Sequence, residues 1–118
     1  EPYLKKTNQS QVLITTTEII NQKKPFWGLY SASKAALEQI AYSYAEEIQN
    51  TNIKVNLIDP GIVNTKLRLK AYPGEDKQKI TQPSDLSDFF EDILFNDKFT
   101  NGELIRYADW LESSKRIN

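Results

Sequence analysis

The 118-residue chain contains no cysteine, no histidine and no methionine, and it has only four glycines. Without cysteine it has neither disulfides nor thiolate chemistry. Without histidine, Ser-His and Cys-His triads, His-ligated zinc and imidazole acid–base catalysis are excluded within this chain. Any acid–base chemistry must therefore use other side chains, and we expect no metal site.

Long apolar runs and strong charge are also missing. No stretch approaches the roughly 18 apolar residues of a membrane span, and the first residues do not resemble a signal peptide. The net charge of −1 gives no electrostatic reason to expect nucleic acid or an acidic membrane as partner. With 39% hydrophobic and 26% charged residues, the composition is that of an ordinary globular protein. We therefore expect a cytoplasmic protein.

The first half of the chain has the pattern of a strand, a helix and a second strand. Residues 11–17 form a short β-branched run, which predicts a strand buried on both faces. Residues 18–29 follow as a loop, and residues 53–58 predict a second strand, ended by Asp-Pro-Gly. Between them, residues 31–50 predict a helix. Its apolar stripe comprises Leu37, Ile40, Ala41, Tyr44 and Ile48. This order predicts a parallel βαβ unit with a right-handed crossover.

The second half of the sequence gives weaker signals. Residues 62–82 predict a long loop with room for one helical turn, and its charges of alternating sign indicate a solvated segment. A second helix is predicted over residues 84–95, with Ser84 as its N-cap. Residues 103–107 predict a third strand, and the polar tail that follows has no assigned element. We expect residues 1–118 to form one α/β unit.

Tyr30 and Lys34 lie four residues apart at the head of the first predicted helix, so they share one face of it. A tyrosine ordinarily titrates near about 10, and a neighbouring positive charge favours its phenolate. The pair is therefore a workable proton donor and acceptor. The alternative is an ordinary helix-start tyrosine beside a solvated lysine, and spacing alone does not separate the two.

The order of these motifs resembles the second half of a short-chain dehydrogenase/reductase. Residues 30–34, Tyr-Ser-Ala-Ser-Lys, match the Tyr-x-x-x-Lys of that family, and residues 60–65 match its Pro-Gly-x-Val-x-Thr after the sixth strand. Residues 27–28 and 71–79 resemble the bacterial YciK-type branch. The resemblance implies an α/β fold, the C-terminal half of a Rossmann-like doubly wound parallel sheet without its dinucleotide-binding half.

The same resemblance implies catalytic roles for three residues. Tyr30 is the expected general acid/base, and Lys34 is expected to lower the pKa of that phenol and to hold the nicotinamide ribose. Thr17, 13 residues before the tyrosine, takes the position of the serine that orients the substrate carbonyl, with Thr16 as its neighbour. A threonine hydroxyl donates the same hydrogen bond but has a stiffer side chain. The alternative is an ordinary strand-end threonine.

The implied cofactor is NAD or NADP. Tyr30, Lys34 and the Thr65 hydroxyl belong to its expected site, and residues 66–82 are the expected substrate loop. Backbone contacts to the nicotinamide are expected from Pro60, Gly61, Ile62 and Val63. The alternative reading of Pro60-Gly61 is a simple strand-to-loop turn.

The family's Gly-rich phosphate turn is not found among the four glycines. Since the chain also has no initiator methionine, we interpret it as a piece of a longer protein. Two functions follow as hypotheses. The first is an NAD(P)-dependent oxidoreductase acting on a small carbonyl/alcohol substrate. The second is an inactive remnant, structural or self-associating. In either case the helix over residues 31–50 is a candidate homo-oligomer interface.

Overall fold

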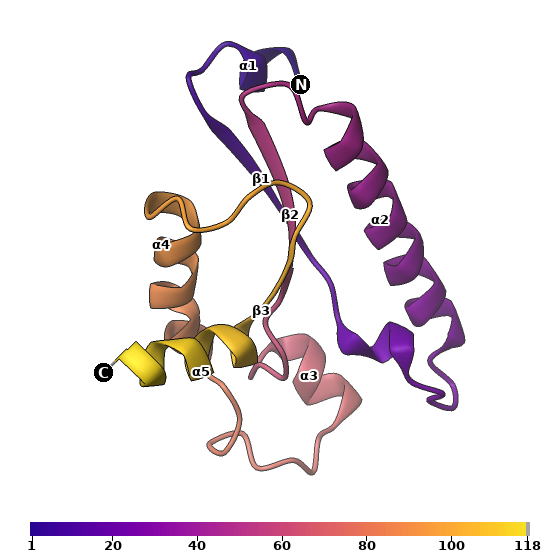
Figure 1. The fold of residues 1–118 in the computed structure, drawn as a ribbon. Helices are drawn as coiled ribbons and strands as arrows, with labels where there is room; N and C mark the ends of the chain where they lie inside the picture. Colours follow the sequence, from indigo (N-terminus) through magenta and orange to yellow (C-terminus); the bar gives the residue numbers. More distant parts are fainter. Residues whose placement is uncertain (118) are drawn as a thin grey trace. The chain divides into compact units, whose positions relative to one another are not determined.

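The computed structural model describes the backbone of residues 1–117 and the side chains of all of these except residues 19, 20, 116 and 117. It divides into two compact units. The sheet unit comprises residues 1–59 and 99–105, and the helical unit comprises residues 60–98 and 106–118. The elements (Figure 1) are α1 (Pro2–Lys5), β1 (Ser10–Thr15), the 3-10 helix η1 (Glu18–Asn21), α2 (Gly28–Glu47), β2 (Ile53–Asp59), α3 (Lys66–Ala71), the 3-10 helix η2 (Pro83–Leu86), α4 (Ser87–Phe95), β3 (Leu104–Arg106) and α5 (Tyr107–Ile117).

The sheet has three strands in the order β1-β2-β3. β1 and β2 pair in parallel, with the register running from Ser10 opposite Ile53 to Thr15 opposite Ile58. On the other edge of β2, the carbonyl of Val55 accepts from the Gly102 amide at 2.8 Å, and the Leu57 amide donates to the Glu103 carbonyl at 2.9 Å. The residue numbers of the two paired segments increase in the same direction, so this edge of β2 is parallel too. The predicted α/β class with a parallel strand–helix–strand unit is confirmed.

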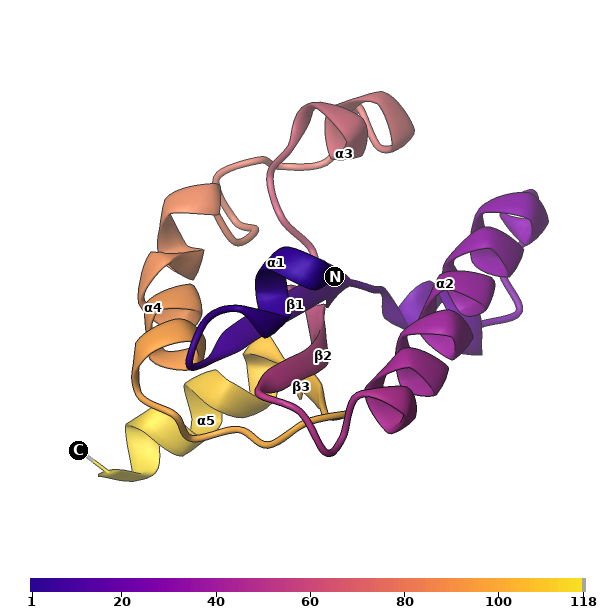
Figure 2. The same ribbon diagram turned by 90° about the horizontal axis from the view of Figure 1, so that it is seen from above.

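β2 is the buried strand of the sheet unit. Its residues 55–59 are all buried, as expected for a central parallel strand covered on both faces. Figures 1 and 2 show α2 running alongside it. The helix buries small side chains there, which allow its backbone to approach the sheet closely. The resulting apolar cluster comprises Ala41, Ala45, Ile48, Ile53, Val55 and Leu57.

Two asparagine side chains complete the hydrogen bonding beside β2. Asn101 accepts from the Val55 amide at 2.8 Å and donates to the Ala45 carbonyl, at the C-terminal end of α2, at 2.7 Å. Asn56, almost fully buried, accepts from the Glu103 amide at 2.8 Å. These bonds satisfy backbone groups that burial would otherwise leave without partners. Gly102 adopts a φ of +80°, which only a residue without Cβ tolerates easily.

The element boundaries in the sheet unit differ from prediction by a few residues. α2 begins at Gly28 rather than at residue 31, and the Ser31 amide donates to the Trp27 carbonyl at 2.9 Å in its first turn. The predicted loop over residues 18–29 contains η1. Two members of the predicted apolar stripe, Leu37 and Ile40, are exposed within the described chain. The stripe prediction is therefore correct only for Ala41, Tyr44 and Ile48.

The elements of the helical unit differ from the sequence pattern at three places. Residues 84–95 form two elements, η2 and α4, and the N-cap is Gln82 rather than Ser84. The amide of Gln82 donates to the Asp85 carboxylate at 2.8 Å, which places the cap two residues earlier. Residues 62–82 contain α3, which is longer than one turn. The tail without an assigned element is mostly the helix α5.

An aromatic cluster joins α4 to α5 inside the helical unit. Phe89 is fully buried, with its ring centroid 5.4 Å from that of Tyr107 and 5.3 Å from that of Trp110. Beside them, the buried Asp92 carboxylate accepts from Trp110 Nε1 at 2.8 Å and from Lys98 Nζ at 2.9 Å. Hydrogen bonds, first from Asn96 and then from Trp110, lower the pKa of Asp92 to about 2.

We expect Asp92→Asn to lower the free energy of unfolding by about 2 kcal/mol at pH 7. A carboxyl whose pKa is depressed by folding contributes fully above its ordinary pKa, 3.8, and loses this contribution as pH falls toward about 2. The difference between the variant and the wild type should therefore shrink below about pH 4. Urea unfolding followed by circular dichroism between pH 7 and pH 3 measures it.

Glu91→Gln is the matched control, because Glu91 is the exposed neighbour on the same helix. It should change the stability by less than about 0.5 kcal/mol. A loss for Asp92→Asn that stays constant over the whole pH range would contradict the assigned charge-stabilised role of this carboxylate.

Candidate active site

Tyr30 and Lys34 lie in the first two turns of α2, one turn apart. Both side chains are half-buried. The Trp27 ring, at the N-cap, meets the Tyr30 ring edge to face with the centroids 5.4 Å apart. This contact holds the tyrosine ring at the head of the helix, where the sequence motif placed it.

Thr17 follows β1 by two residues and is half-buried. Its neighbour Thr16 is buried, and the Thr16 hydroxyl donates to Glu38 Oε2 at 2.8 Å. A hydroxyl has one proton to donate, and that of Thr16 is engaged by this carboxylate. Thr16 is therefore excluded as the donor to a substrate oxygen, and Thr17 stays the predicted one.

Topology brings these residues to one edge of the sheet unit. β1 and β2 are parallel, so their carboxyl ends lie at the same edge, which is where ligands bind in open α/β sheets. α2 connects the two strands and crosses back, so its N-terminal end, with Tyr30 and Lys34, lies toward that edge. Thr17, Tyr30 and Lys34 are thus grouped by the fold, although they are spread over 18 positions of sequence.

The second group of predicted site residues, 60–65, belongs to the helical unit. Pro60 follows directly after β2, and Gly61 has a φ of +75°, a backbone conformation that favours glycine. Among the described residues, and leaving out its chain neighbours, no heavy atom lies within 4 Å of the position that a Cβ on Gly61 would occupy. Ile62 is exposed, whereas Val63 is half-buried and forms a β-bridge to Thr81.

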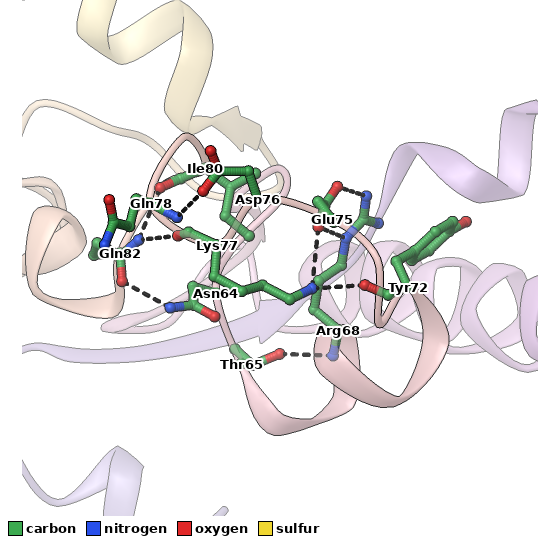
Figure 3. A network of polar contacts seen from close by, with 10 residues as sticks. All are labelled: Asn64, Thr65, Arg68, Tyr72, Glu75, Asp76, Lys77, Gln78, Ile80 and Gln82. Carbon is green, nitrogen blue, oxygen red and sulfur yellow. Dashed lines mark hydrogen bonds and ion pairs between the residues drawn. The ribbon is translucent and has the colours of Figure 1, made fainter.

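The Thr65 hydroxyl caps α3 by accepting from the Arg68 amide at 3.2 Å. This bond uses an oxygen lone pair and not the hydroxyl proton. Next to it, Asn64 donates to Gln82 Oε1 at 2.9 Å, while Gln82 Nε2 donates to the carbonyls of Lys77 and Ile80 (Figure 3). The two ends of the predicted substrate loop are therefore joined by side-chain hydrogen bonds.

An ion pair organises the middle of that loop (Figure 3). The Arg68 guanidinium donates to both Glu75 oxygens, at 2.8 and 2.7 Å, and lies over the Tyr72 ring, 3.8 Å from its centroid. Lys77 Nζ donates to the Tyr72 carbonyl at 2.8 Å. Hydrogen bonds from Arg68 lower the pKa of Glu75 to about 2. The prediction of a merely solvated charge pattern is wrong here, because the side chains of Arg68 and Glu75 are only 22% and 24% exposed.

We expect Glu75→Gln to loosen this segment, because it removes the charge that holds Arg68 against Tyr72. Trypsin should then cleave after Arg68, Lys70 and Lys77 roughly three- to tenfold faster than in the wild type at neutral pH. Mass spectrometry of the timed digest identifies the cleaved bonds.

Asp76→Asn is the control for this change, since the carboxylate of Asp76 reaches Lys79 only at 4.0 Å and both side chains are largely exposed. Its cleavage rates should match those of the wild type. Equal rates for Glu75→Gln and the wild type would show that the ion pair does not hold the segment.

The described residues contain no candidate metal site and no candidate membrane span. Within residues 1–117, no three side chains of the carboxylate, histidine or cysteine type group closely enough to hold a metal ion. None of the helices in that range combines the length and the apolar character required to cross a bilayer.

Sequence reasoning missed Glu38 as part of this region. Glu38 stands four residues after Lys34 and eight after Tyr30, on the same face of α2, and this spacing was the available signal. The sequence offered no matching sign that Thr16 would be its partner.

The sequence of this chain matches a known protein family and known relatives. The sequence model of a family described as short chain dehydrogenase matches residues 1–76, which include both groups of candidate site residues. The oxidoreductase YciK of Escherichia coli K12, described as uncharacterized, is 33% identical over 96 residues, covering 81% of this chain and 38% of YciK.

Solved structures of related proteins have the same fold over most of this chain. A short chain dehydrogenase from Salmonella enterica serovar Typhi superposes with a TM-score of 0.82 at 30% identity, over 89% of this chain and 44% of that one. A short chain dehydrogenase from E. coli CFT073 in complex with NADPH gives 0.81 at 30% identity, over 89% and 44%. The chain therefore spans less than half the length of these proteins, and the predicted partial Rossmann-like fold is confirmed.

Proposed function

The chain belongs to the short-chain dehydrogenase family, and we propose that it carries the catalytic residues of an NAD(P)-dependent oxidoreductase acting on small carbonyl or alcohol compounds. One observation supports this above the others. The sheet unit groups Thr17, Tyr30 and Lys34 at the carboxyl edge of two parallel strands. A phenol, an ammonium and a hydroxyl at such an edge are the groups that proton transfer to a carbonyl oxygen needs.

In the proposed reaction, Tyr30 gives its phenolic proton to the substrate oxygen as the carbonyl becomes an alcohol. When bound, a nicotinamide cofactor would supply the hydride to the carbonyl carbon. Lys34, one turn further along α2, stabilises the phenolate that remains. Thr17 donates a hydrogen bond to the substrate oxygen and so orients the carbonyl. In the reverse direction Tyr30 takes the proton from the alcohol.

The cofactor proposed is NADP or NAD, and NADPH is the first to test because a similar structure was determined with it. The residues present fit the nicotinamide side of such a cofactor. The open space at Gly61 lets a ligand approach the backbone of residues 60–63 closely. We propose that the Thr65 hydroxyl donates to a ligand oxygen, because its bond to Arg68 uses only a lone pair, and that Lys34 holds the ribose. The four glycines form no Gly-rich turn after a strand, so this chain does not supply the pyrophosphate cradle.

We also propose a cytoplasmic location and a homo-oligomer formed through α2. Exposed apolar side chains on this helix support the second proposal: Leu29 is 91% and Ile40 is 64% exposed. One α/β unit over residues 1–118 remains our proposed domain arrangement.

A second candidate function is an inactive piece that is structural or self-associating. The sequence feature that favours it is the lack of a Gly-rich phosphate turn. The two candidates differ in nucleotide binding, which is measurable without knowing the substrate.

We expect NADPH to bind saturably to the protein that carries this chain, after its intact mass has been measured. Trp27 and Trp110 are the two tryptophans of this sequence, and Trp27, which packs on Tyr30, is the fluorescent reporter beside the candidate site. Titration with NADPH and with NADH should quench this signal to a plateau. No change up to millimolar nucleotide would support the inactive piece instead.

We expect Tyr30→Phe to reduce turnover of a carbonyl substrate by about 10²-fold or more, because only the proton path is lost. The affinity for NADPH should change less than about threefold, since the ring remains. Tyr3→Phe is the control, because Tyr3 is 80% exposed and lies outside the candidate site. Substantial activity in Tyr30→Phe would show that another group handles the proton.

A further inference from the structure

The face of α2 that carries Tyr30 and Lys34 continues to a third polar residue, Glu38. The three recur at intervals of four, so they line one side of the helix. Glu38 is half-buried, and its Oε2 accepts from the Thr16 hydroxyl at 2.8 Å. This bond joins the helix face to the residue immediately before Thr17.

Thr16 is also held by its backbone. Its amide donates to the Ile58 carbonyl at 2.8 Å, which carries the ladder between β1 and β2 one residue beyond β1. Ile58 is fully buried, and Thr16 itself is only 7% exposed. At Thr16, then, the end of one strand is tied through its backbone to β2 and through its side chain to α2.

Among the residues that the structure describes, no side chain in the first half of α2, which carries Tyr30 and Lys34, is fully buried. The buried residues of this helix are Ala41 and Ala45, both in its second half. In its first half, Leu29 and Leu37 are exposed. A hydrogen bond from a buried hydroxyl to a carboxylate is directional and stronger than one between neutral groups, so Glu38 is well suited to fix this first half.

We infer that Thr16 and Glu38 are positioning residues, whose hydrogen bond sets the distance between Thr17 and the face of α2 that carries Tyr30 and Lys34. Thr17 follows Thr16 directly, so a sideways movement of Thr16 is passed to Thr17. A misplacement of about 1 Å between reacting groups can reduce a rate by about 10²-fold. The catalytic consequence rests on the proposed function, whereas the geometric one does not.

The geometric part is tested in the ¹⁵N-labelled 118-residue chain by comparing Thr16→Val with Thr16→Ser. Valine keeps the shape and removes the donor, and serine keeps the donor. In Thr16→Val the backbone amide resonances of Thr17 on one side and of Lys34 on the other should both shift, and Thr16→Ser should return both toward the wild type. Shifts confined to Thr16 and Glu38, or equal shifts in the two variants, overturn the inference.

The catalytic part is tested in the protein that turns over a carbonyl substrate with NADPH. Thr16→Val should lower kcat by about tenfold with KM changed less than about twofold, and Thr16→Ser should restore most of kcat. Glu38→Ala should match Thr16→Val and is the second variant if that one does not fold, with exposed Glu46→Ala as its control. Equal kcat in the wild type, Thr16→Val and Glu38→Ala overturns the positioning role.

The two failures are distinguishable. A wild type that binds no nucleotide and shows no turnover rejects the proposed function, and the resonance shifts then decide the geometric inference alone. A wild type with turnover that is insensitive to both variants keeps the proposed function and rejects the positioning role.

Discussion

The need to hydrogen-bond a buried strand on both of its edges constrains the whole sheet unit. Residues 55–59 of β2 are buried, and a buried amide or carbonyl without a partner costs free energy comparable to a lost hydrogen bond. β1 satisfies one edge along its full length. The other edge is satisfied by Gly102, Glu103 and the side chain of Asn101, which reach β2 before β3 has begun. The position of the loop before β3 is thus dictated by β2.

This constraint also creates the candidate active site. A parallel partner for β2 requires a crossover, and α2 supplies it. The helix begins near the edge at which β1 ends and carries the chain back to the start of β2, so its first turns, with Tyr30 and Lys34, lie toward the edge that Thr17 follows. The approximate grouping of Thr17, Tyr30 and Lys34 at one edge of the sheet follows from topology alone. The exact distance between Thr17 and the face of α2 that carries Tyr30 requires a specific contact. The hydrogen bond from Thr16 to Glu38 joins the end of β1 to that face.

The features that could be predicted from the sequence are those that depend on residues close together in the chain. The β-branched run before Thr17 and the periodic apolar residues after Lys34 each determine an element through neighbours a few residues away. The pair Tyr30 and Lys34 was also local, because a spacing of four defines a helix face. α5 was not predictable in this way, since its first turn is fixed by Tyr107 and Trp110 packing on Phe89, which lies about 20 residues earlier.

The polar contacts of the candidate site were hidden for the same reason. Arg68 and Glu75 read as members of an alternating charge pattern, and only the chain's return after α3 places the carboxylate on the guanidinium fork. The hydrogen bond from Thr16 to Glu38 joins residues 22 positions apart, and neither a threonine nor a glutamate in the sequence indicates which residue it will bond. Motif and periodicity therefore identified the groups with chemistry, but not the contacts that hold them.

The helical unit combines a small apolar cluster with charged contacts. Asp92 joins α4 to α5, and Glu75 closes the turn after α3; hydrogen bonds hold the pKa of each carboxyl at about 2. Because both pKa values are depressed, these contacts are complete above about pH 5 and weaken together as pH falls toward 2. The pairing of β1 with β2 consists instead of neutral backbone hydrogen bonds, which do not titrate. Acid should thus loosen the helical unit, where residues 60–65 and the loop behind them lie, while the backbone pairing of β1 with β2 loses no charged contact.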